Sequence, residues 1–132
     1  MRFNYKVFDA GWAMMKITCG KDYVELTASY LHDSLRDLAS AVLALIDGAR
    51  EATAIFMDES GEHHVNFRRV GDEDIDIEVL WYSDWKSWGL DSSVPQIQFT
   101  CRTRLAHSRS TCIHNEPDPD RRRNAWLPRK VD

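Results

Sequence analysis

The 132-residue chain has 43% hydrophobic and 29% charged residues, the ordinary balance of one globular domain. No apolar stretch is long enough to span a membrane, and the first residues lack the apolar run of a secretory signal, so the expected location is the cytoplasm. The three cysteines, Cys19, Cys101 and Cys112, are odd in number and scattered, which excludes a disulfide framework.

The net charge of −4 is unevenly distributed along the chain. Residues 1–101 carry 9 Lys/Arg against 17 Asp/Glu, a net charge of −8, whereas residues 102–132 carry 8 against 4, a net charge of +4. An acidic body repels phosphate backbones, so nucleic acid is not expected as a partner. The arginines at 121–123 lie in a mixed-charge segment and are weak evidence for nucleic-acid binding.

Alternation of apolar and polar residues predicts three strands before residue 29 and four after residue 50. Short turn signals, most of them containing glycine, separate many of these strands, so neighbours in sequence are expected to pair antiparallel. The predicted strands are 3–8, 12–19, 23–27, 52–58, 63–70, 75–82 and 96–105.

The segment 29–48 is the only one with a strong helical signal. Its apolar residues recur at spacings of three and four, which predicts one buried stripe. The stripe comprises Leu31, Leu35, Leu38, Val42 and Leu45. Ser29 and Asp33 are both candidates for the N-cap, and Gly48 suits the left-handed residue that ends a helix. Leu43 and Ala44 fall outside the stripe, so we expect the second half of the helix to be covered on more than one side.

These elements predict an α+β fold, with one amphipathic helix packed on a curved antiparallel β-sheet of about six to seven strands. We expect the helical stripe to pack on Ile75, Ile77, Val79 and Phe99. A single domain is predicted over residues 1–114, followed by a Pro/Arg-rich C-terminal tail over 115–132. Trp126 and Leu127 in that tail could dock on the domain or on a second chain.

Four aromatic residues crowd into eight positions around one predicted loop, namely Trp81, Tyr82, Trp85 and Trp88. Tryptophan is enriched at interface hot spots, so one hypothesis is a partner-binding loop. The alternative is a loop that packs on its own sheet.

An acidic run follows the predicted turn at Gly71, and it comprises Asp72, Glu73, Asp74, Asp76 and Glu78. If the two hairpins lie side by side, Asp58, Glu59 and Glu62 extend this run into an acidic edge. Such an edge suits a basic partner or a cation, or it serves only to discourage sheet-to-sheet aggregation.

Catalytic and metal chemistry find little support in the sequence. His63 and His64 are adjacent on a predicted strand and should point to opposite faces. Cys112 and His114 form one C-x-H pair, with no second pair at zinc-finger spacing. Asp33 and Asp37 are expected on the solvated side of the helix, where they cannot act as an acid–base pair. We therefore predict no catalytic residue, no metal site and no cofactor.

Three groups of residues resemble small uncharacterised bacterial α+β proteins, some of which look like immunity proteins of toxin–antitoxin or contact systems. These groups are Gly11-Trp12-Ala13, then Ser29-Tyr30-Leu31 with Asp33 and Leu35, then Asp58-Glu59-Ser60-Gly61. The likeness covers about residues 3–82 and supplies no catalytic residue. Such proteins usually close with an amphipathic helix, where this chain has its Pro/Arg-rich tail.

The preferred hypothesis is a non-enzymatic cytoplasmic binding protein, immunity-like in its action, that antagonises a basic protein partner. Its candidate partner-binding residues are Asp72, Glu73, Asp74, Asp76, Glu78, Trp85 and Trp88. One alternative is a small enzyme or ligand-binding domain with a pocket between helix and sheet. A second alternative is a structural homo-oligomer such as a homodimer, which an apolar helix side or an unpaired sheet edge would favour.

Overall fold

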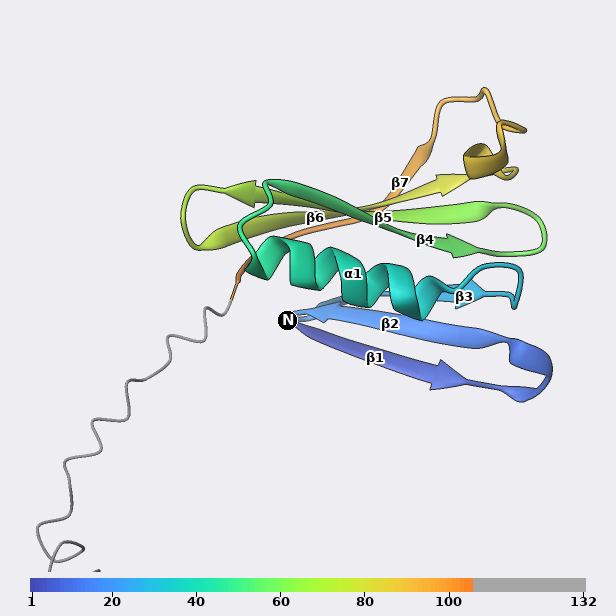
Figure 1. Ribbon diagram of the computed structural model, residues 1–132, viewed down its shortest axis with the longest axis horizontal. Coiled ribbons are helices and arrows are strands. Elements are labelled where there is room, and N and C mark those ends of the chain that lie inside the picture. The colour runs from blue at the N-terminus through green and yellow to red at the C-terminus, as the bar shows by residue number, and fades with distance from the viewer. Residues whose placement is uncertain (106–132) are drawn as a thin grey trace, which may run out of the picture.

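The computed structural model describes residues 1–105 as seven strands, one α-helix and two short 3₁₀ turns (Figure 1). The strands are β1 (Arg2–Val7), β2 (Ala13–Cys19), β3 (Asp22–Ala28), β4 (Glu51–Met57), β5 (Glu62–Val70), β6 (Asp74–Tyr82) and β7 (Gln96–Arg104). The helix is α1 (Ser34–Ile46), and the 3₁₀ turns are η1 (Asp9–Gly11) and η2 (Lys86–Trp88). Predictions for Cys112, His114 and the tail 115–132 lie outside the described residues.

The α+β class and the antiparallel pairing of sequence neighbours are confirmed, but the strands form two sheets. One sheet has the order β1-β2-β3 and the other β4-β5-β6-β7, so the expected single sheet of six to seven strands is wrong. The break falls where the helix separates β3 from β4. There the Ser29 amide, just after β3, donates to the carbonyl oxygen of Met57 at the end of β4 over 2.7 Å, but the two strands form no ladder.

One hydrophobic core joins both sheets and the helix. Met15 and Ile17 of β2 and Leu26 of β3 supply its three-stranded side. The four-stranded sheet supplies alternate residues, as its period of two requires. These are Ala54, Phe56, Val65, Phe67, Ile75, Ile77, Val79 and Phe99. Because these residues fill one face of the four-stranded sheet, the other face is left to solvent or to a partner.

The helix begins and ends where its capping residues predict. The Asp33 carboxylate accepts the Arg36 amide over 3.0 Å, so Asp33 rather than Ser29 is the N-cap. Gly48 follows the C-cap with φ of +99°, a conformation that glycine adopts without a steric penalty. Across residues 1–105, no helix has the length and apolarity that a membrane crossing needs.

The buried side of α1 is rotated from the expected stripe. Its buried residues are Ser34, Leu38, Ala41 and Leu45. Leu35 is 48% exposed, so its predicted burial is wrong. The rotation follows from Asp37, which lies half-buried against the four-stranded sheet instead of on a solvated face. Its carboxylate accepts the Ile55 amide of β4 over 3.2 Å and contacts His32 at 2.6 Å. This bond satisfies an edge-strand amide and sets the helix against β4.

Candidate functional site

The outward face of the four-stranded sheet, hereafter the open face, carries cross-strand rows of side chains, beginning with Val70-Asp74-Arg104 beside the β5–β6 turn and continuing with four more. Of these four, two rows are polar, one is mainly apolar, and the last lies beneath residues 83–95, hereafter the β6–β7 loop. In order, the four rows are Glu51-Arg68-Asp76-Arg102, Thr53-Asn66-Glu78-Thr100, Ile55-His64-Leu80-Ile97 and Met57-Glu62-Tyr82. The helix packs on the other side of this sheet, so the polar rows stay accessible.

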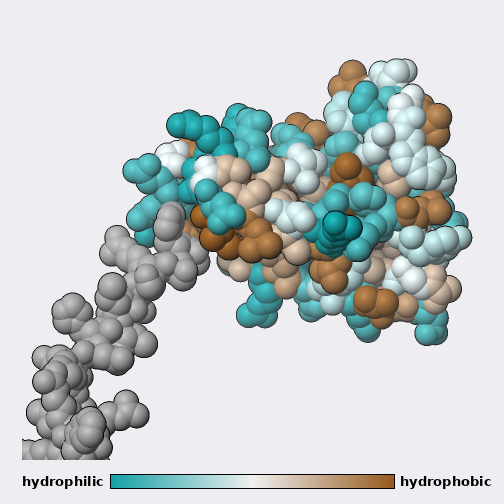
Figure 2. Space-filling view, viewed as in Figure 1, coloured by the Kyte–Doolittle hydropathy of each residue, from teal (hydrophilic) through white to brown (hydrophobic). Residues whose placement is uncertain are grey.

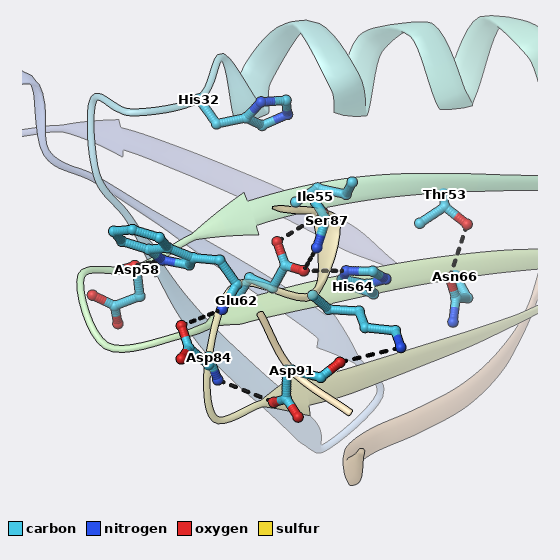
Figure 3. A network of polar contacts seen from close by, with 12 residues as sticks. His32, Thr53, Ile55, Asp58, Glu62, His64, Asn66, Asp84, Ser87 and Asp91 are labelled. Atoms are coloured by element: carbon cyan, nitrogen blue, oxygen red, sulfur yellow. Dashed lines mark hydrogen bonds and ion pairs between the residues drawn. The ribbon is translucent and has the colours of Figure 1, made fainter. Parts of the chain in front are cut away.

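A hollow of about 810 Å³ lies over the two polar rows. All four strands contribute to its lining, with Thr53 from β4, Asn66 from β5, Glu78 from β6 and Thr100 from β7. The Thr53 hydroxyl donates to the Asn66 side-chain oxygen over 2.9 Å, which fixes both groups (Figure 3). The arrangement is a concave polar surface rather than a closed cavity.

One carboxylate organises the charged row of the hollow. Asp76 accepts from Arg102 at 2.6 Å and 3.0 Å, and from Arg68 at 3.5 Å. The Arg102 hydrogen bond holds the pKa of Asp76 below its usual range. Both arginines remain mostly exposed, at 67% for Arg68 and 61% for Arg102. Asp76 is thus neutralised within the row by its two arginines.

A fully buried carboxylate, Glu62, fastens the β6–β7 loop across the far end of the open face. It accepts from the Ser87 amide, from the Ser87 hydroxyl at 2.8 Å and from His64 Nε2 at 3.0 Å (Figure 3). The His64 ring packs against Tyr82 at a tilt, with ring centroids 4.5 Å apart. Burial raises the pKa of Tyr82, with Glu62 as a further cause. These contacts hold the β6–β7 loop in a defined conformation on the open face.

Asp91 holds the same loop from inside. Its carboxylate accepts from the amide and hydroxyl of Ser93, from the Asp84 amide and from the Ser83 hydroxyl. Led by the Ser93 hydroxyl, these donors lower the pKa of Asp91 to about 2. Asp91 is therefore ionised at any physiological pH, and the loop keeps its internal bonds.

The two tryptophans of this loop differ in exposure. Trp85 is half-buried, and its indole N–H donates to the Asp58 carbonyl oxygen over 2.7 Å. Trp88 is 54% exposed and meets Trp85 edge to face, with ring centroids 4.7 Å apart. Trp85 therefore packs beneath Trp88 and holds its ring in place, while Trp88 is exposed at the end of the open face.

The structure separates the predicted acidic residues. Asp72 and Glu73 are exposed in the β5–β6 turn, and Asp74 begins β6. Asp76 and Glu78 follow on the open face, where their residues line the hollow. The β4–β5 turn with Asp58 and Glu59 lies at the other end of β5, about 27 Å away for nine residues. The two hairpin turns therefore do not form one acidic edge, and buried Glu62 belongs to neither.

The histidines of β5 point to opposite sides, as their adjacency predicts. His63 faces inward, where its ring packs against Trp81 at a tilt, with ring centroids 4.6 Å apart, and its Nδ1 lies 2.8 Å from the Gln98 side-chain oxygen. Burial lowers the pKa of His63. Burial also raises the pKa of Cys101 to about 12, with neighbouring Cys19 as a further cause, which leaves it a poor nucleophile. Of the residues that the structure describes, no three His, Cys, Asp or Glu gather as metal ligands do.

The sequence predicts several residues of the site, Asp76, Glu78 and Trp88 among them, but not the contacts that hold its loop. It places Glu62 beside the acidic run, whereas in the structure Glu62 anchors a loop whose contacting residue stands 25 positions later. The polar rows were detectable, because strand alternation already places Arg68, Asp76 and Arg102 outward. Asp91 and Ser87 carry no periodic signal, since both lie in an irregular loop.

Comparison with known proteins adds no assignment to this geometry. No family model, curated protein or solved structure matches the chain. The resemblance to immunity-like proteins stays a prediction. What the site can do chemically must therefore be inferred from its own charges, exposure and shape.

Proposed function

We propose that the chain is a non-enzymatic binding protein that takes a basic protein partner on the open face. The observation that carries this proposal is the concave polar face of β4–β7, left uncovered by the helix and ending in an exposed tryptophan on a fastened loop. Residues 1–105 contain 11 Lys/Arg against 17 Asp/Glu, a net charge of −6, so the domain attracts cationic surfaces over a long range.

Three parts of the face would have separate roles. Asp72, Glu73 and Asp74 are charges at the turn and would steer a basic partner during encounter. Trp88 would supply the apolar anchor that dominates binding energy in many interfaces. The polar rows between them would pair with the partner's hydrogen-bonding groups, with Glu78 as an acceptor near the centre. An immunity-like antagonist of a basic toxin would use this arrangement.

A small-molecule site is the second candidate, favoured by the volume of the hollow. A volume of about 810 Å³ lies within the range of ligand pockets. Ligand pockets, however, bury most of the ligand among apolar side chains, whereas this hollow is open and its exposed lining is more polar than apolar. A protein surface suits it better.

The test begins with pull-down of partners from the native host, followed by association rates measured across salt. Neutralising the turn with Asp72→Asn, Glu73→Gln and Asp74→Asn should slow association roughly tenfold at low salt, and much less near 0.5 M salt. The matched control, Asp9→Asn with Asp22→Asn and Glu25→Gln, makes the same charge change on the three-stranded part of the molecule.

Trp88→Ala should instead accelerate dissociation, with Tyr23→Ala as its control because Tyr23 is 59% exposed on β3. Loss of about 2 kcal/mol of binding free energy is expected for a central aromatic anchor. Equal on-rates for the two triple variants at every salt concentration, together with unchanged dissociation for Trp88→Ala, would move the function to the small-molecule candidate.

A further inference from the structure

The helix exposes an apolar strip beside its buried side. Leu35, Leu43 and Ile46 are 48%, 60% and 60% exposed, and exposed Ala39 and half-buried Val42 lie between them. At 100° per residue these five positions fall within about 100° of the helix circumference. Figure 2 shows hydrophobic side chains gathered over the C-terminal half of α1. The second half of the helix is therefore not covered within the described residues, contrary to the sequence expectation.

We propose that this strip is a homodimer interface, in which α1 pairs antiparallel with α1 of a second copy about a twofold axis. A twofold interface must be self-complementary, because the same surface faces itself. Antiparallel pairing meets this need, since it sets Leu35 against Ile46 of the second copy. Ala39, which lies near the middle, is small enough to let the two helix backbones approach closely.

Charge selects the antiparallel arrangement over the parallel one. Arg36 and Asp47 are 11 residues apart, close to three helical turns, so they lie on the same flank of the strip. Neither side chain joins an ion pair among residues 1–105. In an antiparallel pair, Arg36 lies opposite Asp47 of the second copy, and this contact occurs twice. In a parallel pair the same flanks of the two helices lie on opposite sides of the interface, so Arg36 and Asp47 of the two copies would not meet.

The size of the strip predicts a weak dimer. Pairing two helices of 13 residues through half-exposed aliphatic side chains would bury on the order of 1,000 Å² in total, the lower limit for a specific interface. We therefore expect dissociation constants of roughly micromolar order. The open face is on the other side of β4–β7, so it stays accessible in the dimer.

The first experiment is analytical ultracentrifugation of the full chain from about 1 to 500 μM, which brackets a micromolar constant. The wild type should pass from monomer to dimer over this range. Leu43→Gln with Ile46→Gln should remain monomeric with an unchanged circular dichroism spectrum. Val7→Gln is the control, because Val7 is 66% exposed on β1 and lies off the helix. A wild type that is monomeric at every concentration would overturn the proposal.

The second experiment separates helix pairing from other occupants of the strip. Arg36→Asp alone, and Asp47→Arg alone, should each weaken the dimer about tenfold by placing like charges opposite each other, and the double variant should restore it. Both changes suit the helix dipole, so folding is not compromised. If residues 106–132 cover the strip, the chain stays monomeric and the swap has no effect. A wild type that dimerises, with a double variant that dimerises no better than the single variants, would refute this interface.

Discussion

Replacing Glu62 by glutamine tests whether one buried carboxylate fastens the β6–β7 loop. The substitution keeps the size of the side chain but removes the charge and turns one acceptor into a donor. Ser87 presents two donors to Glu62, its amide and its hydroxyl, and His64 presents a third at 3.0 Å. A glutamine cannot accept all three, so at least one of these donors loses its partner.

The expected loss follows from these contacts. A hydrogen bond to a charged group contributes about 1.5–3 kcal/mol, and an orphaned buried donor costs about 1–3 kcal/mol. Since rotation of Ser87 and entry of water relieve part of this cost, we expect Glu62→Gln to lower the free energy of unfolding by about 2–4 kcal/mol. Glu59→Gln, in the exposed β4–β5 turn, is the matched control and should change it by less than about 0.5 kcal/mol.

Two measurements check this expectation. Urea unfolding reports the global loss, and hydrogen exchange at the Ser87 amide reports local release of the loop. Ser87→Ala removes only the hydroxyl, so a double-mutant cycle with Glu62→Gln should show coupling of about 1 kcal/mol or more. An unfolding free energy unchanged within about 0.5 kcal/mol, with unaltered Ser87 exchange, would refute the anchoring role.

Three further outcomes follow from burial and close approach. Leu38→Ala should cost about 2–5 kcal/mol in a denaturant titration, against less than about 1 kcal/mol for Leu35→Ala, because only Leu38 is buried. Burial lowers the pKa of His63 from 6.5, so the unfolded chain binds a proton more readily than the folded one, and the wild type should lose stability as pH falls below 6.5. His63→Gln should flatten this loss of unfolding free energy, measured from pH 7.5 to 4.5. Gly61→Ala should cost more than about 1 kcal/mol by thermal unfolding, since its Cβ would meet the Tyr82 carbonyl oxygen and lie 2.7 Å from Trp81.

Local signals in the sequence predicted the elements well. All seven strands lie within one or two residues of their predicted ranges, because strict alternation and turn residues mark each one. The helix begins after one of its two candidate caps and ends before Gly48. These features depend on neighbours in sequence, so one chain suffices to find them.

Contacts between residues far apart in the sequence could not be predicted from it. Division into two sheets depends on whether β3 and β4 share a ladder, and nothing local encodes that pairing. The side that α1 buries depends on Asp37 reaching the Ile55 amide, a contact across 18 residues. Likewise, Glu62 is buried only because the β6–β7 loop, which follows it by more than 20 residues, folds over it. The tertiary contacts that form the site are therefore the part that periodicity could not supply.

The two proposed surfaces are geometrically independent, and that independence has a consequence for binding. The open face looks outward from β4–β7, whereas α1 packs on the inward side and presents its strip away from β4. A dimer formed through α1 would therefore carry two accessible open faces. On a surface crowded with partner molecules, the second contact becomes intramolecular, and avidity exceeds the affinity of one face. Weak pairing of the helices would then make binding strength depend on the concentration of the chain itself, because only the dimer engages two partners at once. A monomeric binder with the same open face would show no such dependence.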